Sequence, residues 1–190
     1  MFYTNMPGGQ QTMAWEIDSA HSSIEFSVKH MMVSTVKGRF TRFTGTFDLD
    51  EANHNASKAN FNIETASIDS SDVNRDNHLR SPDFFDAAAY PATTFTSTQI
   101  NKKNDTQYDV TGDLTLHGVT KSVVLAVTLE GKFTSLYGKE TYAFSGSTSI
   151  NRKEFGLNWN QALEAGGVLV SEKVNISFEL QVNAPANVTA

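Results

Sequence analysis

The residues that most often do chemistry are present in this sequence, but their spacing matches no familiar metal site. The five histidines lie far apart, at His21, His30, His54, His78 and His117. None belongs to a close ligand pair such as H-E-x-x-H, and the chain has no cysteine to supply a thiolate ligand or nucleophile. We therefore predict no metal site, and we expect His54 and His117 to lie in turns.

Motifs for nucleophilic and nucleotide chemistry are also missing from the sequence. The chain contains no G-x-S-x-G elbow, no G-x-x-x-x-G-K-[ST] phosphate loop and no G-x-G-x-x-G fingerprint. Serine, histidine and aspartate are plentiful, so a hydrolase stays a rival function, although no pattern singles out a catalytic set. We predict that the protein is not an enzyme and requires no cofactor.

Composition argues against two classes of partner. Fifteen basic and 21 acidic residues in 190 give a net charge of −6, and without a basic block we expect no nucleic acid partner. No stretch approaches the roughly 20 apolar residues of a spanning helix, so we expect no stable membrane insertion.

The first residues lack the basic and apolar regions of a secretion signal. We expect a cytoplasmic protein as the sequence stands, or a periplasmic one if a signal was removed or replaced.

Apolar and polar residues alternate over most of the chain, which is typical of half-buried strands. The clearest case is 174–182, and 24–30, 43–49, 108–116 and 142–150 show the same period. Short turn signals separate these runs, so neighbouring strands should be antiparallel. We predict an all-β fold of about eight strands, several of them 10 residues or longer.

One region, about 70–89, breaks this alternation and predicts a helical insert in two short pieces. Ser70 or Ser71 can cap the first piece, and Ser81 followed by Pro82 reads as the start of the second. The insert should cover an end or edge of the sheet. No linker divides the chain, so we predict one domain over 14–184, with tails at 1–13, expected to be flexible, and 185–190.

Eight antiparallel strands with one apolar face form either a two-sheet sandwich or a closed barrel, and closure removes exposed sheet edges. A barrel of this size is either filled by side chains or holds one small ligand. Its inward faces mix Phe with the small residues Gly45, Gly112, Ala126 and Gly146, a pattern that fits both outcomes. A channel between long strands would be narrow and apolar and would suit a long hydrocarbon chain.

Several ordered motifs resemble the YceI-like family of lipocalin-like, polyisoprenoid-binding proteins. The resemblance covers about residues 15–183 and is carried by DSAHSSIEFSVKH at 18–30, VKGRF at 36–40, FTG at 43–45, NRDNHLRSPDFFD at 74–86, GDLTLHGVTK at 112–121 and INRKEFGL at 150–157. It implies an extended eight-stranded antiparallel barrel with a helical insert and an elongated apolar pore. The implied ligand is an isoprenoid quinone, a polyprenyl chain or a fatty amphiphile, and a homodimer is also implied. Many relatives carry a secretion signal, and we expect none in this sequence as it stands.

The candidate ligand-binding residues follow from the apolar faces and the family motifs. Asp76 and His78 could anchor a headgroup near the pore mouth, and His30 could offer a polar group inside. Because adjacent helical positions do not share a face, we expect only one of Phe84 and Phe85 to face a ligand. The full predicted set is Phe26, Val28, His30, Phe43, Phe47, Asp76, His78, Leu79, Phe84, Phe85, Phe144, Phe155, Ile176 and Phe178.

These observations lead to a primary function and an alternative. We predict non-catalytic binding, sequestration or transport of a long-chain amphiphile such as an isoprenoid quinone, a polyprenyl chain, a fatty acid or a fatty amide. The alternative is a barrel with a filled interior that acts through its surface as a stress or interaction protein. The state of the barrel interior separates the two.

Overall fold

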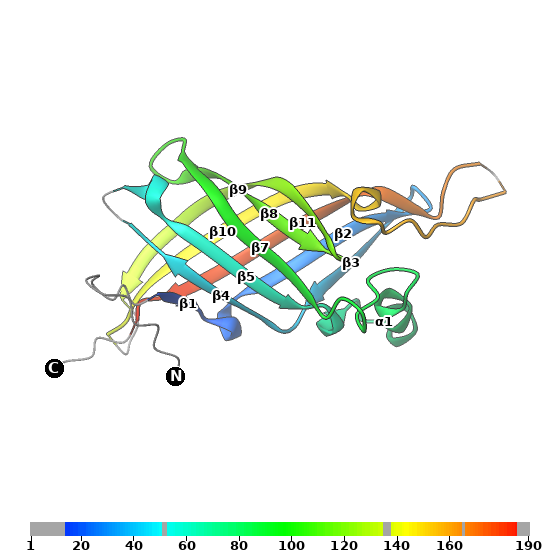
Figure 1. Ribbon diagram of the computed structural model, residues 1–190, viewed down its shortest axis with the longest axis horizontal. Coiled ribbons are helices and arrows are strands. Elements are labelled where there is room, and N and C mark those ends of the chain that lie inside the picture. The colour runs from blue at the N-terminus through cyan, green and yellow to red at the C-terminus, as the bar shows by residue number, and fades with distance from the viewer. Residues whose placement is uncertain (1–13, 51–52, 135–137, 165, 186–190) are drawn as a thin grey trace.

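Segments with alternating side chains form the strands of an antiparallel sheet that closes on itself (Figure 1). The computed structural model describes residues 14–50, 53–134, 138–164 and 166–185. The strands in these residues are β1 (Trp15–Ile17), β2 (Ser23–His30), β3 (Ser34–Phe40), β4 (Phe43–Asp48), β5 (Lys58–Glu64), β6 (Ile68–Asp69), β7 (Ala92–Lys102), β8 (Gln107–Leu116), β9 (Val119–Thr134), β10 (Glu140–Asn151) and β11 (Val170–Asn183).

These eleven segments make eight barrel strands, because three barrel strands are each interrupted once. The breaks separate β1 from β2, β3 from β4 and β5 from β6, and the 3₁₀ turns η1 (Ser19–His21) and η3 (Thr65–Ser67) occupy two of them. Each half keeps the same neighbouring strand: β1 pairs with β4 and β2 with β3, while β5 pairs with β4 and β6 with β3. The predicted eight strands are thus confirmed.

The barrel closes where β11 meets the first barrel strand. On one side β11 pairs with β10 along its length, and on the other it pairs with β2 and then with β1. All the ladders are antiparallel and join barrel strands that follow one another, apart from this closing contact. The structure therefore confirms the predicted antiparallel barrel and excludes the sandwich.

Burial along β11 shows that the barrel is packed unevenly. Leu180 and Val182 are buried, whereas Val174, Ile176 and Phe178, on the same inward face, keep accessible surface. Inward side chains stay accessible only if the space in front of them is not filled. The interior is therefore hollow along part of its length.

The helical insert forms as α1 (Val73–Arg80), which lies at one end of the barrel (Figure 1). Its N-cap is Asp72 rather than Ser70 or Ser71, because the Asp72 carboxylate accepts hydrogen bonds from the backbone N–H groups of Asn74 and Arg75. Ser71 instead has a left-handed backbone with φ of 63°. The chain turns there before the helix begins.

The prediction of a second helical piece after Ser81 is wrong, because the segment forms consecutive turns. Ser81 ends α1, and its hydroxyl donates to the carbonyl of His78 rather than capping a new helix. The backbone N–H groups of Phe85 and Ala87 bond back to Leu79 and Arg80, and Asp86 has a φ of 42°. Ser-Pro suits a turn as well as a helix start, so the sequence did not separate the two.

Short 3₁₀ turns complete the fold. η2 (His54–Ala56) follows β4, and η4 (Arg152–Phe155) follows β10. His117, expected in a turn, lies in the turn between β8 and β9. Residues 1–13 and 186–190, which make up most of the two predicted tails, lie outside the described residues.

Candidate functional site

Two cavities lie inside the barrel, one toward each end. The larger has a volume of about 310 Å³ and lies at the end that carries α1, where α1 and the segment after η4 contribute to its wall. The smaller, about 110 Å³, lies between the end of β4, the start of β5 and the start of β10. The larger cavity alone reaches the lower end of the range typical of small-molecule sites, about 300 to 1,000 Å³.

The two cavities adjoin, because Phe61, Phe95, Leu125 and Phe178 line both of them. These four side chains come from β5, β7, β9 and β11, so they form a ring of apolar groups around the middle of the barrel. Together the cavities define a narrow apolar path along the barrel, with these side chains at its waist.

Three inward-facing glycines let phenylalanine rings lie against the barrel wall. A Cβ atom placed on Gly38 would lie 2.4 Å from Cζ of Phe26, and one placed on Gly146 would lie 2.2 Å from Cζ of Phe178. A Cβ on Gly112 would lie 2.3 Å from Cζ of Phe95. Each ring therefore occupies the space that a larger residue would take. In this barrel the glycines provide close packing at the wall while the axis stays hollow.

The structure brings most of the predicted site residues to these cavities. The larger is lined by Phe26, Val28, His30, His78, Leu79, Phe84, Phe85, Ile176 and Phe178. The smaller is lined by Phe47, Phe144 and Phe178. Phe43, Asp76 and Phe155 line neither: Phe43 and Phe155 are buried in the two core clusters, and Asp76 makes local hydrogen bonds.

Phe84 and Phe85 both face the larger cavity, so the expectation that only one would do so is wrong. That expectation assumed a helix, whereas these residues lie in turns, where adjacent side chains can converge. Phe85 packs edge-to-face on Phe40, with ring centroids 6.0 Å apart. Phe84 instead joins a cluster with His78 and Trp159.

This aromatic cluster lies where the insert meets the segment after η4. The His78 ring lies 5.0 Å from Phe84 and 4.8 Å from Trp159, measured between centroids, and Phe84 lies 5.1 Å from Trp159. His78 Nε2 is 2.9 Å from a carboxylate oxygen of Asp83. The cluster therefore packs the insert and the later segment together over the larger cavity.

Asp76, predicted to anchor a headgroup, has a local structural role. Its carboxylate accepts hydrogen bonds from the backbone N–H of Ser70 at 2.8 Å and from the Ser70 hydroxyl at 2.5 Å. Arg75 donates to the same hydroxyl and to the Ser70 carbonyl, both at 2.8 Å. These bonds fix the start of α1, and Arg75 rather than Asp76 contributes to the cavity wall.

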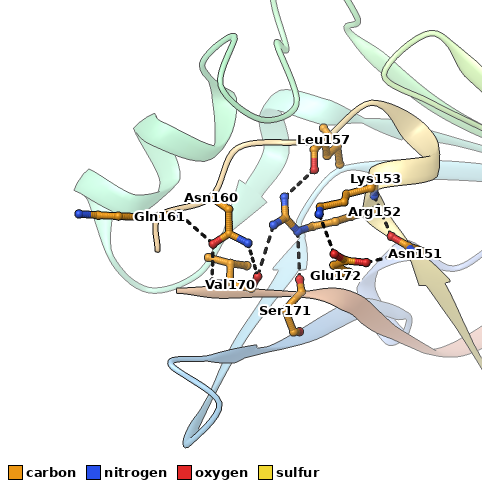
Figure 2. A network of polar contacts seen from close by, with 9 residues as sticks. All are labelled: Asn151, Arg152, Lys153, Leu157, Asn160, Gln161, Val170, Ser171 and Glu172. Carbon is orange, nitrogen blue, oxygen red and sulfur yellow. Dashed lines mark hydrogen bonds and ion pairs between the residues drawn. The ribbon is translucent and has the colours of Figure 1, made fainter. Parts of the chain in front are cut away.

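Sequence reasoning missed the most deeply buried charged group in the cavity wall, Arg152. Its side chain is only 3% exposed, and its guanidinium donates to three backbone carbonyls (Figure 2). The bonds reach Ser171 at 3.0 Å, Leu157 at 2.5 Å and Val170 at 3.4 Å. Arg152 therefore ties the segment after η4 to the start of β11.

Burial lowers the pKa of the Arg152 guanidinium from its ordinary value, and the nearby Glu172 carboxylate opposes that shift. Glu172 itself is held by Lys153 at 2.6 Å, and this hydrogen bond lowers the pKa of its carboxyl (Figure 2). Arginine stays protonated in proteins. The larger cavity therefore has a permanent positive charge in its wall.

Trp159 and Leu169 also line the larger cavity without having been predicted. They lie in an irregular segment between η4 and β11, where no apolar period marks an inward side chain. Asn160 holds this segment, since its side-chain N donates to the Val170 carbonyl at 2.7 Å and its oxygen accepts from the Val170 N–H (Figure 2). For Arg152, the motif at 150–157 was the available signal.

In the part of the chain that the structure describes, no group of three or more His, Cys, Asp and Glu side chains is placed to hold a metal ion. None of the described helices has the length and apolar character needed to cross a bilayer.

The closed barrel with an apolar interior defines the class of protein, a lipocalin-like β-barrel with room inside for a ligand. A family model described as the YceI-like domain matches residues 15–182, so the chain belongs to the YceI-like family. A UPF0312 protein of Vibrio parahaemolyticus is 42% identical over 154 residues, covering 80% of this chain and 82% of that protein.

Solved structures support the same assignment. BcnA of Burkholderia cenocepacia matches with a TM-score of 0.77 and 28% identity, covering 87% of this chain and 98% of that chain. A domain from Saccharophagus degradans, described as polyisoprenoid binding and implicated in plant cell wall breakdown, matches with a TM-score of 0.69 and 20% identity. That match covers 90% of this chain and 99% of the domain, and it shows the shared fold.

Proposed function

We propose that this protein binds a long-chain amphiphile without catalysis, and that it sequesters or transports this ligand. The candidate ligands are an isoprenoid quinone, a polyprenyl chain, a fatty acid and a fatty amide. The observation that carries the proposal is the pair of adjoining apolar cavities along the barrel, which share four lining side chains. A narrow apolar path suits an extended chain better than a compact polar metabolite.

The energetics of the cavities favour an apolar tail. Burial of apolar surface contributes roughly 25 cal/mol per Å², or about 0.8 kcal/mol for each methylene. The cost of losing translational and conformational freedom offsets part of that gain. A tail that extends from the larger cavity through the waist into the smaller one buries more surface than a ligand confined to one of them.

The polar groups suggest an orientation for the ligand. Arg75, His78 and Arg152 all lie in the wall of the larger cavity, at the end that carries α1. The middle of the path is lined by Phe61, Phe95, Leu125 and Phe178, which offer no polar side-chain atom. We place the headgroup beside α1 and the tail in the waist.

The comparisons agree with a ligand of this type. The domain from Saccharophagus degradans that shares this fold is described as polyisoprenoid binding. The alternative of a filled barrel acting through its surface loses its premise, because the described interior contains two cavities. The homodimer and the cellular compartment stay predictions, and light scattering of the purified protein tests the first.

Mass spectrometry of an organic extract tests the proposal. Protein purified without detergent should carry a prenyl or acyl species in stoichiometric amount, or take one up when a quinone or fatty amide is added. Protein that is empty and takes up neither ligand contradicts the proposal. Protein with the interior residue Phe178 changed to Asp should lose the extracted species, while Phe133→Asp, at an exposed position on β9, should retain it.

A further inference from the structure

An exposed apolar tip stands at the end of the barrel that holds the larger cavity. We define the apolar tip as Met31, Met32 and Val33, in the β2–β3 hairpin, together with Val168. These side chains are 48%, 72%, 83% and 39% exposed, respectively. The two segments touch, because the backbone N–H of Met31 donates to the Leu169 carbonyl at 2.8 Å. Four neighbouring apolar side chains thus face solvent together.

The local fold gives no reason for methionine at the hairpin turn. Met31 and Met32 have positive φ angles of 51° and 59°, and Val33 N–H bonds back to the His30 carbonyl. Turns with positive φ at both central residues favour Asn and Gly, because other side chains crowd the backbone there. The exposed methionine side chains also add little to the core. Their apolar character therefore suggests a contact outside the barrel.

The apolar tip lies on the rim of the larger cavity. His30 and Val36, near the base of the hairpin, line that cavity, and so do Leu169 and Val170 in the adjoining segment. Figure 1 shows the β2–β3 hairpin and the segment before β11 projecting from the same end of the barrel, with α1 on the other side of that end. A surface that covered the tip would lie against the mouth of the cavity.

Charges beside the tip favour an anionic surface. Lys29, Lys37 and Lys173 are exposed on the neighbouring strands β2, β3 and β11. In the part of the chain that is described, none of the three has an ion-pair partner. The adjacent cations Arg39 and Lys153 are neutralised by Asp69 and Glu172. The part of the hairpin next to the tip, from Phe26 to Phe40, therefore contains cations and no acidic residue, in a chain with net charge −6.

Exposed acidic residues also lie at this end of the barrel. Glu164 is in the segment that carries Val168, Glu154 is in η4 and Glu25 is on β2, and none of them lies in the part of the hairpin from Phe26 to Phe40. Asp72, Asp83 and Asp86 belong to the N-cap of α1 and the turns after it, on the other side of this end. The residues that directly flank the apolar tip in the hairpin therefore include Lys29 and Lys37 and no carboxylate.

We propose that the apolar tip docks on an anionic lipid bilayer and holds the mouth of the larger cavity against it. The inference rests on the proposed function in one respect, because a long-chain ligand in the cavity would enter from a lipid phase. Met and Val side chains enter the interface, and the lysines contact lipid headgroups. Docking is peripheral and reversible, since a few side chains supply the apolar area.

Vesicle flotation with the full chain tests this docking. Wild-type protein should float with phosphatidylcholine vesicles that contain phosphatidylglycerol, and less with phosphatidylcholine alone. Met32→Asp should lower the partition coefficient about tenfold or more. Val124→Asp is the matched control, because Val124 is 52% exposed on β9, away from the tip, and this variant should float like wild type. Removal of one lysine, by Lys29→Gln, should cost about fivefold, and added salt should have a similar effect.

Several outcomes would overturn the docking proposal. It fails if wild type does not float, or if Met32→Asp and Val124→Asp bind equally. It also fails if Met32→Asp only changes the oligomeric state, since the tip would then contact a second copy of the chain. Far-UV circular dichroism checks folding, and Met32→Ser repeats the test with a milder change. Uptake of a fatty amide from vesicle-free solution is measured separately, so that loss of vesicle binding alone leaves the proposed function intact.

Discussion

The two ends of the barrel are built from the same alternating strands, yet they differ in polarity and packing. At the α1 end the wall includes Arg75, His78 and Arg152, and non-strand segments cover a cavity of about 310 Å³. At the other end, rings pack in sequence: Trp15 lies 5.0 Å from Tyr142, which lies 6.0 Å from Phe144. That packing leaves only about 110 Å³.

The two ends of the barrel therefore offer different surroundings to a bound ligand. Toward the α1 end a polar group meets Arg75, His78 and Arg152. The wall of the smaller cavity contains the polar side chains of Ser57, Lys58, Tyr108 and Tyr142, and between the two ends a tail finds apolar walls at the waist. The strands form the wall along the whole barrel. The insert and the segment after η4 contribute to the wall at the α1 end alone. Substitutions at the waist, at Arg152, at Gly146 and at the start of α1 each alter one part of this arrangement.

The largest effect is expected at the waist, where Phe178 lines both cavities. Phe178→Asp places a carboxylate among apolar side chains without a cation nearby, which should cost at least about 3 kcal/mol in the free energy of unfolding. Ligand loading should be lost even if the barrel folds. Chemical denaturation and mass spectrometry of extracts measure the two effects. Phe133→Asp should change the free energy of unfolding by no more than about 0.5 kcal/mol. If both variants lost the same stability and the same ligand loading, Phe178 would not lie at the waist.

The next effect concerns the α1 end, where Arg152 binds three carbonyls. Arg152→Met should lower the free energy of unfolding by about 2 to 4 kcal/mol, because part-buried carbonyls lose their donors. Urea denaturation measures the change. Lys153→Met is the control at the next residue, where an exposed ion pair with Glu172 is worth less than about 1 kcal/mol. Similar losses in both variants would contradict the special role of Arg152.

A smaller and more selective effect is expected from Gly146→Ala. The added methyl group would lie 2.2 Å from Cζ of Phe178 and 2.9 Å from the backbone carbonyl oxygen of Ala126, so the ring must move into the waist and β9 must shift slightly. Affinity for chains long enough to cross the waist should fall about tenfold, which is about 1.4 kcal/mol, while short chains bind as before. Titration with fatty acids of two lengths measures the difference. Gly131→Ala is the control, since nothing lies within 4 Å of its added methyl, and a matching loss there would refute the steric explanation.

The smallest effect is expected at the start of α1. The backbone N–H of Arg75 is the main cause that lowers the pKa of the Asp72 carboxyl below its ordinary 3.8. A lowered folded pKa means that the charged cap stabilises the protein above that value and loses its effect as pH falls through the folded pKa. Asp72→Ala should therefore lower the free energy of unfolding at neutral pH, because the first backbone N–H groups of α1 lose their acceptor.

Thermal unfolding across the acidic range measures this contribution. Asp72→Asn keeps an acceptor at the cap, so it should retain most of the stability and remove the pH dependence that Asp72 contributes. If Asp72→Ala and wild type lose stability in parallel as the pH falls, the cap does not contribute as described.

The strands and the barrel could be predicted because a period of two is a local property of the sequence. The run at 174–182 is an example, since each apolar residue in it faces the interior. The second helical piece failed because Ser81-Pro82 is compatible with both a helix start and a turn, and the turn is stabilised by bonds back to Leu79 and Arg80. Local residue types do not encode that choice.

The residues predicted on the strands mostly line the cavities, whereas several cavity residues outside the strands were not predicted. Phe26, Ile176 and Phe178 reach the cavities because alternation fixes their side. Trp159 does so through the fold of an irregular segment, which depends on contacts with His78 and Phe84 far away in the sequence. Asp76 lies in a recognisable motif, but its carboxylate accepts a hydrogen bond from the backbone N–H of Ser70, six residues earlier. A motif identifies such residues without giving their direction.

Isothermal titration with fatty acids of increasing chain length tests the central claim most directly. If the path through the waist holds an extended tail, affinity should rise by about 0.8 kcal/mol, or roughly fourfold, for each added methylene until the path is full, and then stop rising. The length at which the rise stops should be shorter for Gly146→Ala than for wild type. Affinity that does not depend on chain length, or no binding at any length, would contradict a hydrocarbon tail inside the barrel.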